Sequence, residues 1–195
     1  MSTSTNTAGL PRALELAIAL AVLAFAAPLL ALAAIAIKLD SRGPVIYRAR
    51  RVGRAGVEFE LYKLRTMHGG NDPVGVGAPV LAGDARVTRV GGLLRRFSVD
   101  EIPNLVNVVR GEMAVVGPRP TLAAQVADYT PRQRRRLEVK PGITGWAQVN
   151  GRAEIPWEER IELDLEYVER RSLALDLRIL ARTAELLLTG RGLYG

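Results

Sequence analysis

The sequence of 195 residues predicts a helix-rich α+β protein attached to a membrane, and three observations support this fold class. An uncharged run of 22 residues lies near the N-terminus, from Leu16 to Ile37. The segment Asp40 to Met67 holds short β-prone stretches divided by glycine turns, and the C-terminal part has the apolar spacing of helices. A chain of this length forms one compact domain, so we expect a single catalytic or binding domain after the membrane segment.

The composition limits the classes of function. A formal net charge of +7 indicates anionic partners such as phosphates, nucleic acid or a membrane surface. Aromatic residues make up only 5%, which disfavours a nucleic-acid binder that needs stacking platforms. The absence of cysteine excludes disulfides, thiolate metal ligands and a thiol nucleophile. A single histidine, His68, excludes a multi-histidine metal site and is interpreted as a loop residue.

The apolar run is long enough to cross a bilayer. At about 1.5 Å per residue, its 22 residues cover a hydrocarbon core of roughly 30 Å. A signal peptide has a shorter apolar region after a basic start, and here only Arg12 precedes the run. We therefore expect residues 1–11 to be a flexible N-terminus, residues 12–39 to be a membrane helix and residues 40–195 to be the cytoplasmic domain.

Pro28 near the middle of this run predicts a kink between Ala24 and Pro28, because proline lacks the N–H that a helix needs. Spanning helices tolerate proline, so the residues leave open both a kinked single pass and a re-entrant hairpin. Basic residues follow the run closely and predict that its C-terminal side faces the cytoplasm. They are Lys38, Arg42, Arg48, Arg50, Arg51 and Arg54.

The remaining elements follow from local patterns. A hairpin is predicted in Asp40 to Met67, with its turn at Gly53 to Gly56, and the glycine-rich and proline-rich stretch from His68 to Asp84 predicts a mobile loop. The last helix is apolar on one face, where it either meets the membrane surface or packs on the core. That face is formed by Leu177, Leu180, Ala184 and Leu187.

Two adjacent carboxylates, Asp100 and Glu101, precede an apolar segment. Ser98 and Glu101 match a capping box, but Pro103 would then fall where the helix needs an N–H. We therefore expect Asp100 to be the N-cap, with both carboxylates at the positive end of a helix.

The residue types around this dyad suit phosphoryl transfer. Arg95, Arg96 and Arg119 can grip phosphate, and Arg119 lies in a stiff turn between two prolines. One acid could attack while the other helps to hold Mg²⁺, which takes one or two carboxylates plus substrate phosphates. A surface ion-pair cluster is the alternative explanation of the same residues.

Three stretches carry a signal that extends over most of the chain: "RGPVIYRARRVGRAGVEFELYKLRTM", "RVTRVGGLLRRFSVDEIPNLVNVVRGEMAVVGPRP" and "KPGITGWAQVNGR". Together they resemble the bacterial sugar transferases, the monotopic polyprenyl-phosphate phosphoglycosyl transferases. The resemblance implies transfer of a sugar 1-phosphate from a UDP-sugar to undecaprenyl phosphate with release of UMP. This reaction begins the synthesis of exopolysaccharide, capsule or other glycans.

The resemblance also implies roles for single residues. Asp100 would be the nucleophile that carries the sugar phosphate covalently, and Glu101 would assist with Mg²⁺, so both are expected at the metal. The other positions that match family residues are expected to bind substrate or phosphate or to support the site. They are Lys63, Arg65, Arg95, Arg119, Gln148, Arg152 and Asp164.

The family's membrane helix is re-entrant and breaks at a Ser-Pro pair, which is Ala27-Pro28 here. Asn104, in place of the more common Gln, and the glycine-rich segment after Met67 are further departures. The resemblance implies a minimal catalytic unit at the inner membrane, in contact with membrane lipids, and a homodimer through the globular part.

Two other classes of function compete with the transferase. A membrane-anchored scaffold that lost the chemistry would keep its function without Asp100. A nucleic-acid binder would use "RQRRRLEVK", although a solvated charged face explains such a run more simply. Trp146 and Trp157 are either packing residues or substrate contacts, and spacing alone does not select the sugar.

Overall fold

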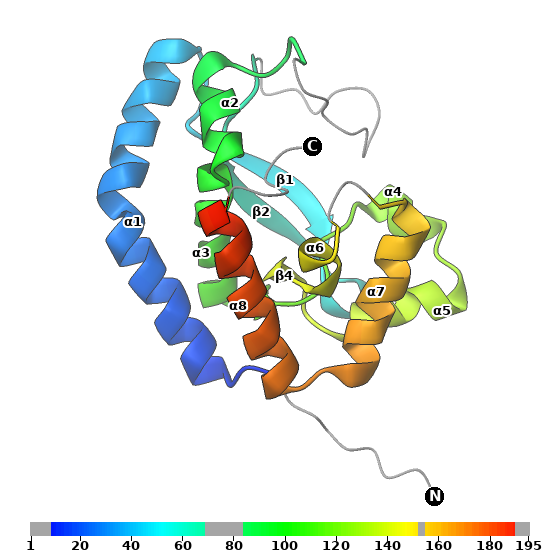
Figure 1. Ribbon diagram of the computed structural model, residues 1–195. Coiled ribbons are helices and arrows are strands. Elements are labelled where there is room, and N and C mark those ends of the chain that lie inside the picture. Colours follow the sequence, from blue (N-terminus) through cyan, green and yellow to red (C-terminus); the bar gives the residue numbers. More distant parts are fainter. Residues whose placement is uncertain (1–8, 69–83, 152–154, 190–195) are drawn as a thin grey trace, which may run out of the picture.

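The computed structural model describes residues 9–68, 84–151 and 155–189 and shows one body wrapped on one side by a long helix (Figure 1). The expected glycine-rich loop falls almost entirely outside these ranges, as do residues 1–8 of the expected flexible N-terminus. The elements confirm a helix-rich α+β fold with a small antiparallel sheet. They are α1 Arg12–Asp40, β1 Ile46–Val52, η1 Arg54–Gly56, β2 Glu58–Leu64, α2 Arg89–Arg96, η3 Val99–Asn104, α3 Leu105–Arg110, β3 Ala114–Val116, α4 Ala123–Ala127, α5 Pro131–Arg134, η4 Arg135–Glu138, β4 Gly142–Thr144, α6 Trp146–Val149, α7 Trp157–Arg170 and α8 Leu173–Thr189.

The predicted hairpin is confirmed. β1 and β2 are antiparallel, with Ile46 opposite Leu64 and Val52 opposite Glu58. The turn between them contains a left-handed residue, Ala55, with φ of 56°. Because side chains alternate across a strand, Ala49, Phe59 and Leu61 lie on one face and are buried, and this face also carries Arg51 and Lys63, which are only partly buried.

A second pair of strands, β3 and β4, is parallel and fully enclosed on the β3 side. The chain after β3 approaches β4 so closely that a Cβ atom on Gly142 would lie 2.1 Å from the backbone nitrogen of Gly117. Only glycine fits such a backbone contact. This contact places the Pro118 to Pro120 turn at the end of the small sheet.

α1 is continuous through Pro28 and bows around the domain, with its concave side toward the core (Figure 1). The buried positions of its middle part are small, namely Ala19, Ala26 and Ala33. Large apolar side chains point outward, and Phe25 is 90% exposed. The most apolar 18-residue window of α1 has a mean hydropathy of 2.7, and α1 is the one described helix long and apolar enough to cross a membrane.

The N-terminal end of α1 is fastened to the core by three hydrogen bonds, two of which are buried. Arg12 donates from Nη2 to the carbonyl oxygen of Val108 at 2.6 Å. The buried Glu15 accepts from the backbone of Val115 at 3.3 Å, and Asp176 accepts from the backbone of Leu10 at 2.7 Å. These bonds satisfy polar groups that would otherwise be buried without partners.

The C-terminal end of α1 is fastened to the same domain. The side chain of Arg65 donates to the carbonyl oxygens of Ser41 at 2.8 Å and Ile37 at 3.4 Å, and also to that of Arg42. Arg65 is only 3% exposed. β2 ends at Leu64, and beyond it the Arg65 guanidinium caps the carbonyls at the end of α1, so its described contacts are structural and its binding of substrate phosphate stays a prediction.

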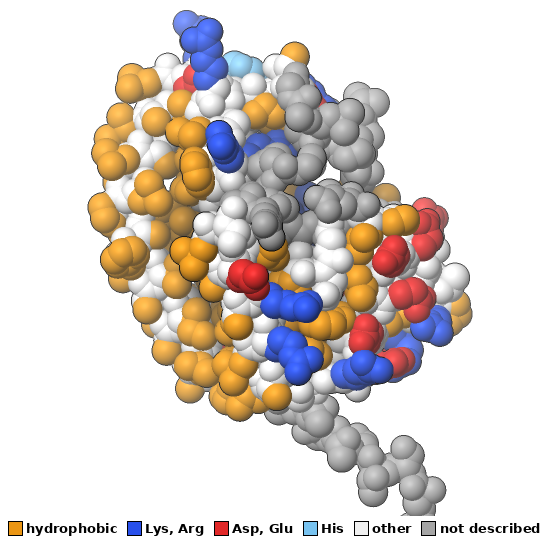
Figure 2. All heavy atoms as spheres, viewed as in Figure 1, with side chains coloured by type: hydrophobic (Ala, Val, Ile, Leu, Met, Phe, Trp, Pro, Cys, Tyr) orange, Lys and Arg blue, Asp and Glu red, His pale blue; other side chains and the backbone are white. Residues whose placement is uncertain are grey.

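α8 exposes most of the apolar face that the sequence indicated. Ile179 and Asp176 face inward and are buried, whereas Leu177, Leu187 and Leu188 are 50%, 47% and 88% exposed. Figure 2 shows hydrophobic side chains spread over α1 and on toward α8 at the lower edge of the view. Of the two interpretations of this helix, the exposed face favours the membrane surface over packing on the core.

Candidate active site

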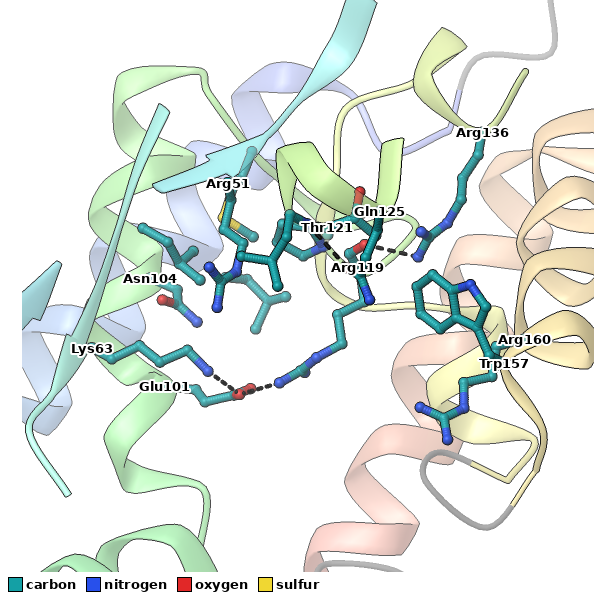
Figure 3. Close-up of a pocket in the computed structure, with 16 residues that line it drawn as sticks. Arg51, Lys63, Glu101, Asn104, Arg119, Thr121, Gln125, Arg136, Trp157 and Arg160 are labelled. Atoms are coloured by element: carbon teal, nitrogen blue, oxygen red, sulfur yellow. Dashed lines mark hydrogen bonds and ion pairs between the residues drawn. The ribbon is translucent and has the colours of Figure 1, made fainter. Parts of the chain in front are cut away.

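A cavity of about 170 Å³ opens between the hairpin, η3, the Pro118 to Pro120 turn and the start of α7 (Figure 3). Within the part of the chain that the structure describes, five cationic side chains and one carboxylate, that of Glu101, line it. The cations are Arg51, Lys63, Arg119, Arg136 and Arg160. Such a surplus of positive charge in a concave site attracts phosphate groups.

Glu101 holds two of these cations on a single oxygen. Its Oε1 accepts a hydrogen bond from Lys63 Nζ at 2.6 Å and another from Arg119 Nη2 at 2.8 Å (Figure 3). Burial alone would raise the pKa of Glu101, but the charges and hydrogen bonds of Arg119 and Lys63 lower it well below its usual range. Glu101 is therefore ionised and serves to position the two cations.

Asp100 differs sharply from its neighbour. It is 8% exposed, and its carboxylate forms no hydrogen bond or ion pair with the described residues. Burial raises the pKa of Asp100, against the lowering effect of the Lys63 charge. A desolvated carboxylate without partners is a stronger base and nucleophile than a solvated one. Glu101 lines the cavity directly, whereas Asp100 lies beside it.

The backbone at the dyad departs from the predicted arrangement. Ser98 adopts a left-handed conformation, with φ of 54°, and the chain continues as the short 3₁₀ helix η3. The expectation that Asp100 is an N-cap is wrong, because η3 starts at Val99 and Ser98 occupies the cap position without a side-chain bond. Pro103 falls just before α3, where its missing N–H is tolerated.

The turn that carries Arg119 is held from three sides. Gly142 donates its N–H to the carbonyl of Pro118 at 2.9 Å, and Val52 donates to that of Thr121 at 2.8 Å. Arg136 donates from Nη2 to the carbonyl of Arg119 itself at 2.8 Å. The Arg119 backbone is therefore fixed, although 54% of its side chain is exposed.

Asp164 supports the site from behind and does not reach the cavity. It is 1% exposed and pairs through Oδ2 with Arg136 Nε at 2.6 Å. Its pair with Arg136 agrees with the expectation that Asp164 supports the site, here by positioning Arg136. Arg136 also donates to the hydroxyl of Tyr129, so its guanidinium has partners on several sides.

The other predicted site residues fall into three cases. Arg95 lies in the last turn of α2, and its charge is among those that lower the pKa of Asp100, which places it near the dyad. Gln148 is buried in α6, and neither polar atom of its side chain has a partner among the described residues. It does not line the cavity, so a substrate contact stays a prediction. Arg152 lies outside the described residues.

Sequence reasoning missed several residues that line the cavity. Arg51 was counted only as a basic flank of the membrane helix, and Arg160 carried no motif. Asn104 was noted as a departure, yet it lines the cavity with a buried Oδ1 that has no partner among the described residues. The alternation of β1 could have shown that Arg51 lies on a different face from Arg50.

The basic run from Arg132 to Arg136 is largely neutralised by α7. Arg132 pairs with Glu162 at 2.5 Å, and Arg135 pairs with Glu169 at 2.8 Å. Arg136 is committed to Asp164. These ion pairs agree with a solvated charged face and remove the main argument for nucleic-acid binding.

Comparison with known proteins decides the family. The model of the family described as "Bacterial sugar transferase" matches residues 6–190. This chain belongs to the bacterial sugar transferase family. The match confirms the expectation drawn from the three motifs, and with it the expectation of a transferase enzyme.

Three relatives show how far the similarity extends. The uncharacterized sugar transferase EpsL of Bacillus subtilis is 45% identical over 157 residues, which cover 80% of this chain and 76% of that protein. The UDP-glucose:undecaprenyl-phosphate glucose-1-phosphate transferase of Caulobacter vibrioides is 44% identical, covering 94% of this chain and 71% of that protein. The Escherichia coli protein of the same name is 43% identical, and the match covers 89% of this bacterial sugar transferase and 39% of the longer relative.

The side-chain oxygens near the cavity of this sugar transferase show whether it could hold the predicted magnesium ion. No group of three or more His, Cys, Asp or Glu side chains converges within the described ranges. Asp100 and the second oxygen of Glu101 offer two carboxylates, and the unpartnered Oδ1 of Asn104 offers a third oxygen at the cavity. This set fits Mg²⁺, which needs few protein ligands when substrate phosphates complete its shell.

Proposed function

We propose that this sugar transferase moves a sugar 1-phosphate from a UDP-sugar to undecaprenyl phosphate and releases UMP. The names of the Caulobacter and Escherichia coli relatives specify this donor class and this acceptor. The observation that carries the proposal is that the two adjacent carboxylates have different surroundings. Asp100 is buried and has no ion-pair partner among the described residues, while Glu101 fixes Lys63 and Arg119 at a cationic cavity.

The reaction proceeds in two displacements at phosphorus. A carboxylate oxygen of Asp100 attacks the β-phosphorus, and the bond from that phosphorus to the bridging oxygen breaks, so UMP leaves with the electron pair. An oxygen of the lipid phosphate then attacks the same phosphorus. The bond to Asp100 breaks, which restores its carboxylate and yields the diphosphate-linked sugar.

The cations stabilise the charge that develops in both steps. Arg119 and Lys63 are preorganised by Glu101, so they need no rearrangement to meet the phosphate oxygens. Arg95 adds positive charge on the Asp100 side. The raised pKa of Asp100 increases the nucleophilicity of its carboxylate once the proton is lost.

Magnesium belongs to this proposal. Asp100, Glu101 and Asn104 would hold it together with the donor's phosphates, where it would neutralise charge on the leaving UMP. Within the chain, Lys63 and Arg119 remain on the other oxygen of Glu101. The metal and the two cations therefore do not compete for the same atom.

The membrane arrangement follows from the two anchored ends of α1. Hydrogen bonds join Arg12 and Glu15 at one end, and Ile37 and Ser41 at the other, to a single domain. Because α1 also packs on this domain through the buried alanines of its middle part, it stays on the side of the bilayer where the domain lies. We therefore place α1 as a re-entrant helix, with its exposed apolar side in the inner membrane and the domain on the cytoplasmic face.

The proposal is tested by UMP release from the detergent-solubilised protein with Mg²⁺ and undecaprenyl phosphate, across a panel of UDP-sugars that includes UDP-glucose. Wild type and Asp100→Asn are compared. Intact mass measurement after donor is added without acceptor reads out the covalent step, because the chain gains the mass of one sugar phosphate.

UMP release with one donor, together with a mass gain that Asp100→Asn abolishes, would support every part of the proposal. If UMP is released without a mass gain, and Asp100→Asn still releases it, the covalent step is refuted but the sugar-phosphate transfer is still supported. Folded wild type that releases no UMP with any donor would refute the transfer itself, and that result would favour the scaffold interpretation.

A further inference from the structure

The cavity has two chemically different ends. In Figure 3, Glu101 and Lys63 lie on one side, while Trp157 and Arg160 lie on the other, with Arg119 reaching between them. Trp157 is the sole aromatic side chain among the described residues that line this cavity. The first end has the groups for phosphoryl transfer, and the second end has no role in that chemistry.

Trp157 is held rigidly although it is partly exposed. The guanidinium of Arg136 lies 5.4 Å from the centre of its ring, a cation–π contact. The ring also packs against a small buried cluster that includes Tyr129, Ile161 and Leu165. A ring fixed in this way offers a stacking surface at little cost in conformational entropy.

Arg160 belongs to the same end of the cavity. It lies three residues after Trp157 in α7, so the two side chains are neighbours on one face of the helix. Its Nε donates to the carbonyl oxygen of Ile155 at 2.9 Å, which orients the guanidinium. A planar cation beside an aromatic ring suits a ligand that combines a flat base with a phosphate.

We propose that Trp157 is the platform on which the donor's nucleobase stacks, and that Arg160 contacts the α-phosphate of the same nucleotide. This inference rests on the proposed function, because that function fixes where the donor's β-phosphorus lies. The β-phosphorus must lie by Asp100 at the Glu101 end, so the nucleoside extends toward the opposite end. Trp157 offers the base an aromatic face there.

The subsite also explains how the leaving group is recognised. The fragment that departs is the nucleoside monophosphate, and it keeps both the base and the α-phosphate. Trp157 and Arg160 therefore bind UMP as well as the donor, whereas Lys63 and Arg119 face the phosphate that is transferred.

The first experiment measures UMP binding by tryptophan fluorescence. The chain has two tryptophans, so Trp146→Phe leaves Trp157 as the sole indole emitter. Trp146 lies in α6, where its Nε1 donates to Glu166 and Arg182 covers its ring, away from the cavity-lining set. We expect saturable quenching by UMP in Trp146→Phe and no quenching by glucose 1-phosphate. An unchanged emission at saturating UMP, with binding confirmed by calorimetry, would overturn the proposal.

The second experiment separates stacking from folding. Trp157→Leu should weaken UMP binding and raise the donor KM by about tenfold, with little change in kcat, and Trp157→Phe should recover part of that loss. Arg160→Gln should weaken UMP binding but not uridine binding, because uridine lacks the phosphate. Thermal unfolding confirms that each variant is folded before its affinity is compared.

The inference and the proposed function fail in different ways. UMP affinity that is equal in wild type and in folded Trp157→Leu would overturn the subsite even if UDP-sugar turnover is normal. UMP binding that depends on Trp157, in a protein that turns over no UDP-sugar, would support a nucleotide subsite while the proposed transfer fails.

Discussion

Asp164 and Arg136 form an ion pair that is almost completely enclosed, with 2.6 Å between Oδ2 and Nε and side chains that are 1% and 3% exposed. From this pair, Arg136 reaches the Arg119 carbonyl at 2.8 Å and the Trp157 ring at 5.4 Å. One buried contact between α7 and η4 thus positions groups at both ends of the cavity.

Asp164→Asn should destabilise the protein severely. The change leaves the Arg136 guanidinium buried without its counter-charge, which costs about 3–5 kcal/mol. Urea unfolding of the detergent-solubilised protein measures this loss. Glu162→Gln is the matched control on the same helix, because its pair with Arg132 is more than half exposed and contributes less than about 1 kcal/mol. Equal losses in the two variants would refute the structural role of the buried pair.

Asp100→Asn should abolish turnover and raise stability at neutral pH. The pKa of Asp100 is raised by burial, so the folded state disfavours its carboxylate form. Wild-type stability therefore falls as pH increases from the unfolded-state pKa through the higher folded-state pKa. The stabilisation by asparagine should be full at pH 8 and vanish toward pH 3. Unfolding curves at several pH values check this, and a less stable variant at pH 8 would contradict it.

Glu101→Gln should reduce both activity and stability, because Lys63 and Arg119 lose their shared counter-ion. A loss of about 1–3 kcal/mol is expected at pH 7. Since the pKa of Glu101 is lowered in the folded state, its stabilising effect is present above the unfolded value of 4.5 and is lost as pH falls below it. The double variant Lys63→Met with Glu101→Gln should lose less unfolding free energy than the two single variants lose together. Strict additivity would argue against the ion pair.

Arg65→Met should destabilise the anchoring of α1 and leave donor recognition intact. Its guanidinium donates to Ile37, Ser41 and Arg42, so at least about 2 kcal/mol should be lost on thermal unfolding. Lys38→Met is a control in the same region, because its single bond to Gly43 is exposed. An increase in donor KM for Arg65→Met, without loss of stability, would instead support the predicted phosphate-binding role of Arg65.

Two adjacent glycines in α2 should respond in opposite ways to alanine. A Cβ on Gly91 would lie 2.1 Å from the carbonyl oxygen of Thr66, whereas one on Gly92 would meet only Val87 at 3.9 Å. Gly91→Ala should therefore cost about 1–3 kcal/mol and displace Arg95, lowering kcat. Gly92→Ala should add about 0.5–1 kcal/mol through helix propensity. Urea unfolding distinguishes them, and equal stability would argue against close packing of α2 on Thr66.

The elements that the sequence predicts well are those with a local cause. Alternation and glycine turns predict the hairpin up to Leu64, and the uncharged run predicts α1. The residue types of the dyad and of the turn at Arg119 predict a phosphate site, because their chemistry does not depend on distant contacts.

The misplaced residues depend on tertiary contacts that spacing does not encode. Lys63 and Arg65 lie on one face by the period of a strand, yet Lys63 meets Glu101 and Arg65 meets the end of α1. The left-handed conformation of Ser98 replaces the expected cap at Asp100. Arg160 enters the cavity only because α7 packs beside the Arg119 turn.

The hydrogen bonds at the start of α1 determine when this helix can reach its native contacts during synthesis. Glu15 can form its bond to Val115 only after 100 more residues have been added, and Leu10 can form its bond to Asp176 only after 166 more. α1 therefore leaves the ribosome before the segments to which it is bonded, and it is among the last elements to acquire its native contacts. During synthesis the apolar helix must therefore be kept from aggregating until the domain has folded.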